Sequence, residues 1–127
     1  PGQLVCYPIL DLHNYKMSIS WYMRSLENII IRLLDEYNIT VNQKPGLTGV
    51  WIDDKKICAM GVRLSRWVTM HGFAFNLNPK MNYFDSMIPC GIFEYGVTSL
   101  HELDIDISMH KLVDKIIVHF NDTFNKI

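Results

Sequence analysis

The sequence predicts a mixed α/β (α+β) domain in which a mostly antiparallel sheet is flanked by helices. Residues 18–37 and 108–124 repeat apolar side chains every three or four positions, which is the period of an amphipathic helix. Residues 73–78 alternate large apolar side chains with small or polar ones, which is the period of a strand. No internal repeat or linker divides the chain, so we expect a single domain over residues 1–127.

The first forty residues predict a strand followed by a long helix. Leu4–Leu10 is apolar and β-branched enough for a buried strand, in which Pro8 indicates an edge or a bulge. Ser18 or Ser20 can cap the helix that follows. One face of this helix is apolar and is expected to face the core: Tyr22, Leu26, Ile29, Ile30, Leu33, Leu34 and Tyr37.

The middle of the chain predicts strands joined by tight turns. Ile39–Val41 is typical of a short strand, and Lys44-Pro45-Gly46 of a turn. Gly49–Ile52 and Lys56–Leu64 are expected to form a hairpin around the polar tip Asp53-Asp54-Lys55.

The last third predicts a strand, a loop and a helix. The alternation of Phe73, Phe75 and Leu77 ends at Pro79. Residues 80–107 show no period, and we expect a long ordered loop of the kind that often carries function. Ser108 can cap a final helix with an apolar face: Met109, Leu112, Val113, Ile116, Phe120 and Phe124.

Composition excludes several classes of protein. Of the 127 residues 49% are hydrophobic and 20% charged, which excludes a disordered chain. The net charge of −1 argues against a general nucleic-acid binder, and no apolar run approaches the roughly 20 residues that cross a bilayer. The basic side chains gather in residues 43–80, where they form either an ordinary salt-bridged surface or a patch for an acidic protein.

Known short motifs for metals and nucleotides are absent. The five histidines, His13, His71, His101, His110 and His119, form no metal-binding spacing such as HxxxH, so we expect no metal. His110 and His119 are expected on the outer side of the last helix. No GxxxxGK[ST] or GxGxxG loop supports nucleotide binding.

The three cysteines differ in their surroundings. Cys6 and Cys58 lie in apolar strands, where a buried, inert thiol is the better interpretation. Cys90 stands between Pro89, which restricts the backbone, and Gly91, which frees it, and this setting can present a thiol at the tip of a loop. The odd number and wide spacing imply no disulfide framework, so a reducing compartment is the default.

Six stretches in order along nearly the whole chain resemble one family, the octanoyltransferases of lipoate synthesis. They are Pro1-Gly2-Gln3-Leu4-Val5, Gly49-Val50-Trp51-Ile52, Lys56-Ile57-Cys58-Ala59-Met60-Gly61-Val62-Arg63, His71-Gly72-Phe73-Ala74-Phe75-Asn76, Ile88-Pro89-Cys90-Gly91-Ile92 and Gly96-Val97-Thr98-Ser99-Leu100. The resemblance implies the catalytic-domain fold shared with biotin- and lipoate-protein ligases. It also implies transfer of an octanoyl group from acyl carrier protein to a lysine of a lipoyl domain, without a cofactor.

The resemblance also implies roles for particular residues. Cys90 occupies the position of the acyl thioester, and Lys56 the position that activates that cysteine. Ala59-Met60-Gly61 and Gly72-Phe73-Ala74 fall on the family's substrate-binding segments. Family members carry a glycine-rich segment just upstream of the position matched by Pro1, so we expect this chain to be the C-terminal part of a longer, N-terminally truncated domain.

The expected partners follow from that reaction. They are octanoyl-acyl carrier protein and the lipoyl domains of 2-oxoacid dehydrogenase and glycine cleavage proteins, with no nucleic acid and no membrane. We expect a monomer, the usual case in the family, and a mitochondrial location on the resemblance of residues 51–58, with the bacterial cytoplasm or a plastid as alternatives.

Elementary chemistry explains why such a reaction needs a lysine near a cysteine. A thiol with a pKa of about 8.5 is only about 3% thiolate at pH 7, and a nearby ammonium favours the thiolate. A fall of about two units makes the thiolate dominant, which corresponds to roughly 2.7 kcal/mol. Lys56 and Cys90 lie far apart in sequence, so the fold has to bring them together.

Two other readings stay open. An ATP-dependent lipoate- or biotin-protein ligase on the same fold activates free acid as an adenylate and needs no pair of cysteine and lysine. A non-catalytic fragment that binds lipoyl domains is the alternative from a different functional class.

Overall fold

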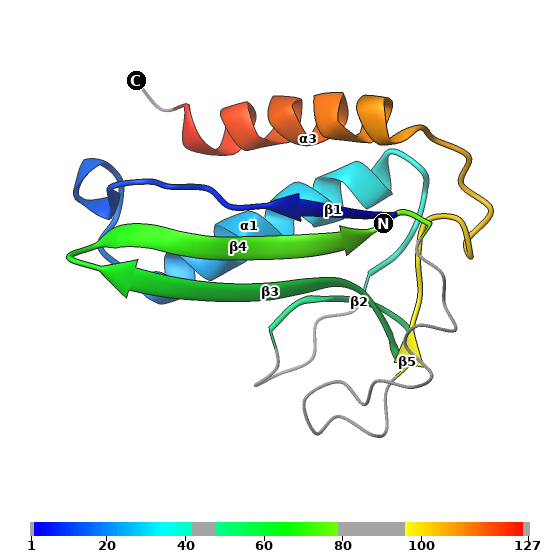
Figure 1. The fold of residues 1–127 in the computed structure, drawn as a ribbon, viewed down its shortest axis with the longest axis horizontal. Helices are drawn as coiled ribbons and strands as arrows, with labels where there is room; N and C mark the ends of the chain where they lie inside the picture. Colours follow the sequence, from blue (N-terminus) through cyan, green and yellow to red (C-terminus); the bar gives the residue numbers. More distant parts are fainter. Residues whose placement is uncertain (1, 42–47, 79–95, 126–127) are drawn as a thin grey trace.

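The computed structural model describes residues 2–41, 48–78 and 96–125 (Figure 1). Its elements are strand β1 (Gln3–Cys6), a short 3-10 turn (Leu12–Asn14), helix α1 (Ile19–Asp35), strands β2 (Val50–Ile52), β3 (Lys55–Ser65), β4 (Val68–Asn76) and β5 (Gly96–Val97), and helix α3 (Met109–Phe124). Among the described residues, no helix has the length and apolar character that crossing a lipid bilayer requires.

The strands form one sheet in the order β1-β4-β3-β2, and every neighbour in that order is antiparallel. The short β5 pairs with the first residues of β3 in parallel. The prediction of a mixed, mostly antiparallel sheet is therefore confirmed. Within the described residues β1 pairs with β4 alone and lies at the edge of the sheet, as Pro8 indicated.

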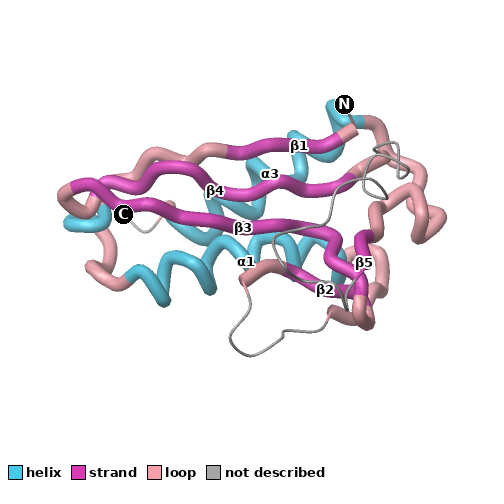
Figure 2. Tube along the Cα trace, turned by 60° about the horizontal axis from the view of Figure 1, so that its bottom comes forward, coloured by secondary structure: helices cyan, strands magenta, loops and turns pink. Residues whose placement is uncertain are grey.

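Both helices lie on the same face of the sheet, as Figure 2 shows with the sheet turned toward the viewer. Their inward side chains and those of the strands form one apolar core, in which the following are almost completely buried: Leu12, Tyr22, Leu26, Ile29, Ile30, Leu33, Leu34, Ile57, Cys58, Phe75, Leu100 and Leu112. Ser18 caps α1 by accepting from the Trp21 N–H, and Ser108 caps α3 by accepting from the Lys111 N–H. Both predicted helices and both predicted caps are therefore confirmed.

A surface cluster ties the end of α1 to α3. The Glu36 carboxylate lies 2.9 Å from the Lys115 Nζ and 2.6 Å from the His119 Nε2. These contacts lower the pKa of Glu36, with the hydrogen bond from His119 as the largest cause. The expectation that His119 lies on the outer side of the helix was wrong, since its side chain is only 17% exposed; His110 is exposed as expected.

The β3–β4 hairpin turns through Arg66 and Trp67, both of which have positive φ. Two residues in this left-handed region fit the twist of a hairpin, although asparagine and glycine are the usual occupants. The main chain of Leu12 supports the turn by donating to the Trp67 carbonyl at 2.8 Å. The sequence lacks the usual turn residues here, and β4 is accordingly longer than the predicted alternation.

Two predicted strands differ from the structure. Strand β1 ends at Cys6 rather than Leu10, because Pro8 has no N–H for the ladder and its carbonyl accepts instead from the Thr69 hydroxyl. Ile39–Val41 is not a strand: Asn38 has a φ of 59°, and the Ile39 N–H closes the end of α1 by donating to the Leu34 carbonyl. These residues complete the helix instead of pairing in the sheet.

The predicted turn at residues 44–46 and most of the predicted loop at 80–107 lie outside the described residues. The described part of that loop begins with β5 and continues into a turn closed by the Ile105 N–H, which donates to the Leu100 carbonyl at 2.9 Å. The predicted β2–β3 hairpin is confirmed, with Asp53 in the left-handed region at its tip.

Candidate functional site

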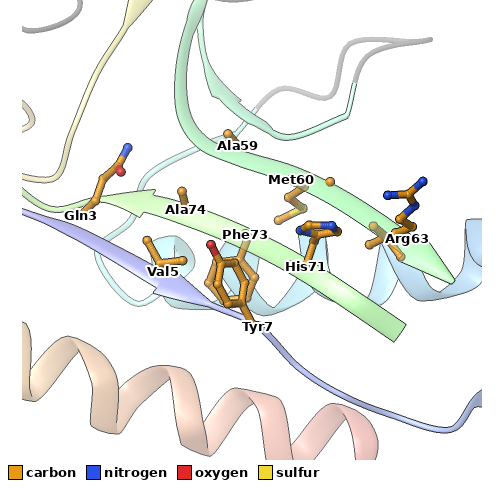
Figure 3. Close-up of a pocket in the computed structure, with 12 residues that line it drawn as sticks. Gln3, Val5, Tyr7, Ala59, Met60, Arg63, His71, Phe73 and Ala74 are labelled. Carbon is orange, nitrogen blue, oxygen red and sulfur yellow. The ribbon is translucent and has the colours of Figure 1, made fainter. Parts of the chain in front are cut away.

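The face of the sheet opposite the helices carries a pocket of about 760 Å³, which we call the open-face pocket (Figure 3). Residues of β1, β3 and β4 and of the chain just after β1 line it: Gln3, Val5, Tyr7, Ala59, Met60, Gly61, Val62, Arg63, His71, Gly72, Phe73 and Ala74. The volume lies in the usual range for small-molecule sites.

Small side chains make room for the open-face pocket. Ala59 pairs with Ala74, and Gly61 with Gly72, across β3 and β4. Because strand side chains alternate between faces, these four residues face the pocket while their large neighbours face the helices. The floor of the pocket is therefore largely main chain and methyl groups, which an alkyl chain can approach closely.

The two glycines face different surroundings. A Cβ at Gly61 would meet nothing within 4 Å. A Cβ at Gly72 would overlap the Cys6 carbonyl oxygen, so only glycine lets β1 approach β4 this closely. Gly61 thus leaves space in the pocket, and Gly72 holds the sheet together beneath it.

The structure brings all six expected substrate-binding residues to this one pocket, from two separate stretches of sequence. Ala59, Gly61, Gly72 and Ala74 line it directly. Met60 and Phe73 line it from below, since their side chains are only 8% and 3% exposed. Sequence reasoning did not single out the remaining lining residues, although the alternation of Gln3, Val5 and Tyr7 along the edge strand is the signal that could have identified three of them.

A polar and aromatic rim borders one end of the pocket. His71 and Arg63 lie there, and the His71 ring stands edge-on to Tyr7 with the centroids 6.4 Å apart (Figure 3). His71 has a φ of 64°, in the left-handed region that non-glycine residues seldom adopt. Such backbone strain is often found at functional sites.

Lys56 lies at the start of β3, beside an irregularity in the pairing with β2. The register shifts there, so that Trp51 is opposite Lys56 although Val50 is opposite Cys58. The Lys56 Nζ stands 4.9 Å from the centroid of the Trp51 ring, which is itself almost fully buried. This cation–π contact holds the ammonium at the end of the sheet where β5 joins.

The first described residues after Cys90 in the sequence pair with the start of β3, beside Lys56. In β5, Val97 is the parallel partner of Lys56, and the Thr98 N–H donates to the Lys56 carbonyl at 2.9 Å. The Gly96 N–H donates to the Asp54 carbonyl at 3.1 Å. Cys90 itself lies outside the described residues.

The two described cysteines are structural. Cys58 is fully buried, and burial raises its pKa well above the ordinary value, although the charge of Lys56 acts in the opposite direction. Cys6 is half-buried in β1, and burial raises its pKa as well. Because a raised pKa keeps a thiol protonated, neither is suited to act as a nucleophile, as the sequence predicted.

Polar side chains are buried beside residues 98–102, which follow β5. Asn76 is 5% exposed; its Nδ2 donates to the Thr98 carbonyl at 3.0 Å, and its Oδ1 accepts from the Gln3 Nε2 at 2.9 Å. The Ser99 hydroxyl accepts from the Glu102 N–H at 3.1 Å, so Ser99 caps a turn. These bonds fix residues 98–102 against the end of β4.

A buried carboxylate lies on the helix side of the same region. Glu27 of α1 is 8% exposed and accepts from the Gly49 N–H at 3.4 Å. Gly49 in turn packs next to the Lys56 stem, since a Cβ there would lie 3.4 Å from the Lys56 Cε. In the described parts of the chain, no three His, Cys, Asp or Glu side chains form a group that could hold a metal ion.

Comparisons with known proteins agree on the family of this fold. The model of the lipoyl protein ligase A/B catalytic domain matches residues 1–121. The octanoyltransferase of Christiangramia forsetii is 50% identical over 98% of the chain and 56% of its own length. The mitochondrial octanoyl-[acyl-carrier-protein]:protein N-octanoyltransferase LIPT2 of Danio rerio is 44% identical over 98% of the chain and 56% of its own length. The chain thus spans about half the length of the curated relatives it matches.

Solved structures show the same fold at low identity. The biotin protein ligase of Aquifex aeolicus in complex with biotin and ATP has a TM-score of 0.76 at 20% identity, over 98% of this chain and 51% of the ligase. A lipoate-protein ligase A bound with ATP has a TM-score of 0.72 at 11% identity, over 97% of this chain and 51% of the ligase.

Proposed function

This chain belongs to the lipoyl protein ligase A/B catalytic-domain family, and we propose that it is the part of an octanoyltransferase that binds and transfers the acyl group. Two features of the same sheet support the proposal. One is the open-face pocket with its floor of small residues, and the other is the return of the chain from Cys90 to Lys56.

The open-face pocket suits an alkyl chain. Ala59, Gly61 and Ala74 offer main chain and methyl groups instead of bulky side chains. Burying the seven carbons beyond the carbonyl of an octanoyl group contributes about 5–6 kcal/mol at roughly 0.8 kcal/mol per methylene. Each carbon then changes affinity only about fourfold, so neighbouring chain lengths are expected to be tolerated.

Cys90 is proposed as the nucleophile and Lys56 as the group that activates it. Cys90 precedes Gly96 by six positions, a reach of about 20 Å in an extended chain, and Gly96 pairs beside Lys56. Trp51 holds the ammonium of Lys56 at this end of the sheet. A cationic neighbour favours the thiolate, which is the reactive form of a cysteine.

The reaction takes place in two half-reactions. The Cys90 thiolate attacks the thioester of the acyl carrier protein, a new carbon–sulfur bond forms, and the carrier thiolate leaves. The amine of the substrate lysine then attacks the acyl-enzyme, a carbon–nitrogen bond forms, and the Cys90 thiolate leaves. After acylation has removed the negative charge near Lys56, that side chain passes its proton to the departing carrier thiolate and then takes up the proton lost by the amine.

The proposed partners are octanoyl-acyl carrier protein and lipoyl domains, including those of 2-oxoacid dehydrogenase and glycine cleavage proteins. Acyl carrier protein is acidic, and the basic residues of the 43–80 stretch are the proposed contact surface, with the enzyme acting as a monomer. The relatives include bacterial octanoyltransferases and a mitochondrial one, and we propose a mitochondrial location, with the bacterial cytoplasm or a plastid as alternatives.

One second candidate has an observation in its favour. The fold is that of ligases solved with ATP, so an ATP-dependent ligase remains the alternative activity. Such an enzyme would modify the lipoyl domain with free octanoate and ATP, whereas the proposed transferase requires the carrier thioester. Supplying each donor alone separates the two activities.

The role of Lys56 is tested by substitution. We expect Lys56→Met to slow octanoyl transfer at pH 7 by about 25-fold, because a two-unit rise in the thiol pKa lowers the thiolate fraction from about three quarters to about 3%. Methionine keeps a stem that can pack on Trp51, so the fold should be retained. The matched control is Lys111→Met, which removes an equal charge from an exposed residue of α3 outside the 43–80 stretch and should leave the rate within about twofold. A Lys56→Met protein that transfers at the full rate would contradict the scheme.

A further inference from the structure

Gln3 has a side-chain amide whose orientation is determined by the structure. It lies on β1 at the end of the open-face pocket next to Ala74 (Figure 3). Its Nε2 donates to the Asn76 Oδ1 at 2.9 Å. One of the two N–H groups of Nε2 is therefore engaged within the protein, while Gln3 as a whole is exposed and lines the pocket.

The orientation follows from a main-chain carbonyl, which can only accept a hydrogen bond. Because the Thr98 carbonyl is the partner of the Asn76 amide, Asn76 turns its Nδ2 toward Thr98 and its Oδ1 toward Gln3. Because the Asn76 Oδ1 is an acceptor, Gln3 donates to it through its Nε2. The Gln3 Oε1 is then an acceptor that the contact with Asn76 does not use, and the second N–H of Nε2 stands beside it.

The same hydrogen bonds place Gln3 at the reacting end of the pocket. Thr98, which accepts from Asn76 through its carbonyl, donates through its N–H to the Lys56 carbonyl at 2.9 Å. Three consecutive hydrogen bonds thus connect the Gln3 amide with the main chain of Lys56. Since β4 alone separates β1 from β3, the two residues lie on the order of 10 Å apart across the sheet.

We propose that the Gln3 Oε1 binds the amine of the substrate lysine during the second half-reaction, by accepting a hydrogen bond from one of its N–H groups. The inference rests on the proposed octanoyl transfer and adds a residue that binds the acceptor substrate. An acyl thioester offers only a carbonyl acceptor and an alkyl chain, so an acceptor oxygen gains nothing from it. An amine offers N–H donors, and a hydrogen bond to one of them orients the nitrogen lone pair toward the acyl carbon.

The experiment separates the two half-reactions. Acyl-enzyme is formed with octanoyl-acyl carrier protein, isolated, and then discharged with a lipoyl domain in a rapid-mixing instrument. For Gln3→Met we expect acyl-enzyme formation within about threefold of the wild type and discharge slowed about tenfold, the loss of one hydrogen bond to the amine.

A second variant separates binding from structure. Gln3→Lys keeps a donor for the Asn76 Oδ1 but has no acceptor for the amine. We expect it to discharge as slowly as Gln3→Met. Discharge by hydroxylamine, a small nucleophile that does not depend on placement by the protein, should remain within about twofold of the wild type in both variants.

Three outcomes would overturn the inference. They are an unchanged discharge rate in Gln3→Met, an equal loss in both half-reactions, and a normal discharge rate in Gln3→Lys. A wild-type protein that forms no acyl-enzyme would instead remove the proposed function itself, and the inference with it, so the two failures are distinguishable.

Discussion

The two faces of the sheet are built from the same strands, but they differ in the size and the burial of their side chains. On the helix side, β3 and β4 present large apolar residues such as Met60, Phe73 and Phe75 to α1 and α3. On the other side the alternate positions are glycine and alanine, and these leave the open-face pocket. Stability is concentrated on one face and candidate chemistry on the other, because the side chains of a strand alternate.

The sharpest test of this contrast is a pair of truncations. Phe75 is completely buried on the helix side, so Phe75→Ala should lower the free energy of unfolding by about 3–5 kcal/mol. Val5 lies on the open face and is 47% exposed, so Val5→Ala should cost less than about 0.5 kcal/mol. Urea unfolding followed by circular dichroism measures both. Equal losses would show that the open face also contributes to the core.

A second pair concerns the two glycines that face each other across β3 and β4. Gly72→Ala should destabilise the fold by about 2 kcal/mol or more, because its Cβ would overlap the Cys6 carbonyl of β1. Gly61→Ala meets open space and should be neutral or slightly stabilising, because alanine has less freedom in the unfolded chain. Thermal unfolding of both variants measures the difference. A larger loss of stability in Gly61→Ala than in Gly72→Ala would contradict this account of the two glycines.

The smallest expected effect lies outside both faces, at the junction between the two helices. Folding lowers the pKa of Glu36 through hydrogen bonds from His119 and Lys115. A lowered carboxyl pKa contributes stability above the unfolded value, and the contribution is lost as pH falls through the folded value. Glu36→Gln should therefore cost up to about 1 kcal/mol at pH 7 and less at pH 3.

The control for this junction is an exposed contact on α3. The His110 Nε2 lies 3.6 Å from the Asp114 carboxylate, and both side chains are more than half exposed. Asp114→Asn should change stability by less than about 0.3 kcal/mol at either pH. If Glu36→Gln lowered the free energy of unfolding as much at pH 3 as at pH 7, packing rather than the ionised carboxylate would join the helices.

Periodicity alone was sufficient for much of the fold. The two helices, their serine caps, the β2–β3 hairpin and the antiparallel sheet were all predictable, because burial imposes its period on the sequence. The β3–β4 turn was missed because Arg66 and Trp67 are not residues that favour positive φ. The false strand at Ile39–Val41 shows the reverse error, in which an apolar run packs on the core without entering the sheet.

The candidate site was predictable only in part. The family resemblance is confirmed by the relatives, and it led to the glycine and alanine residues of the pocket floor. Neighbours that only the fold brings together, such as Tyr7 with His71 and Gln3 with Asn76, have no local signal. Their contacts depend on strand register between residues some 60 to 70 positions apart, which no spacing in the sequence reveals.

The central claim is that the octanoyl group passes through a thioester on Cys90. The most direct measurement is the intact mass of the chain after incubation with octanoyl-acyl carrier protein. The account predicts one octanoyl adduct that hydroxylamine removes and that is absent from a Cys90→Ser variant. An adduct that persists in Cys90→Ser, or octanoylation of the lipoyl domain with no acyl-enzyme at any time, would contradict it.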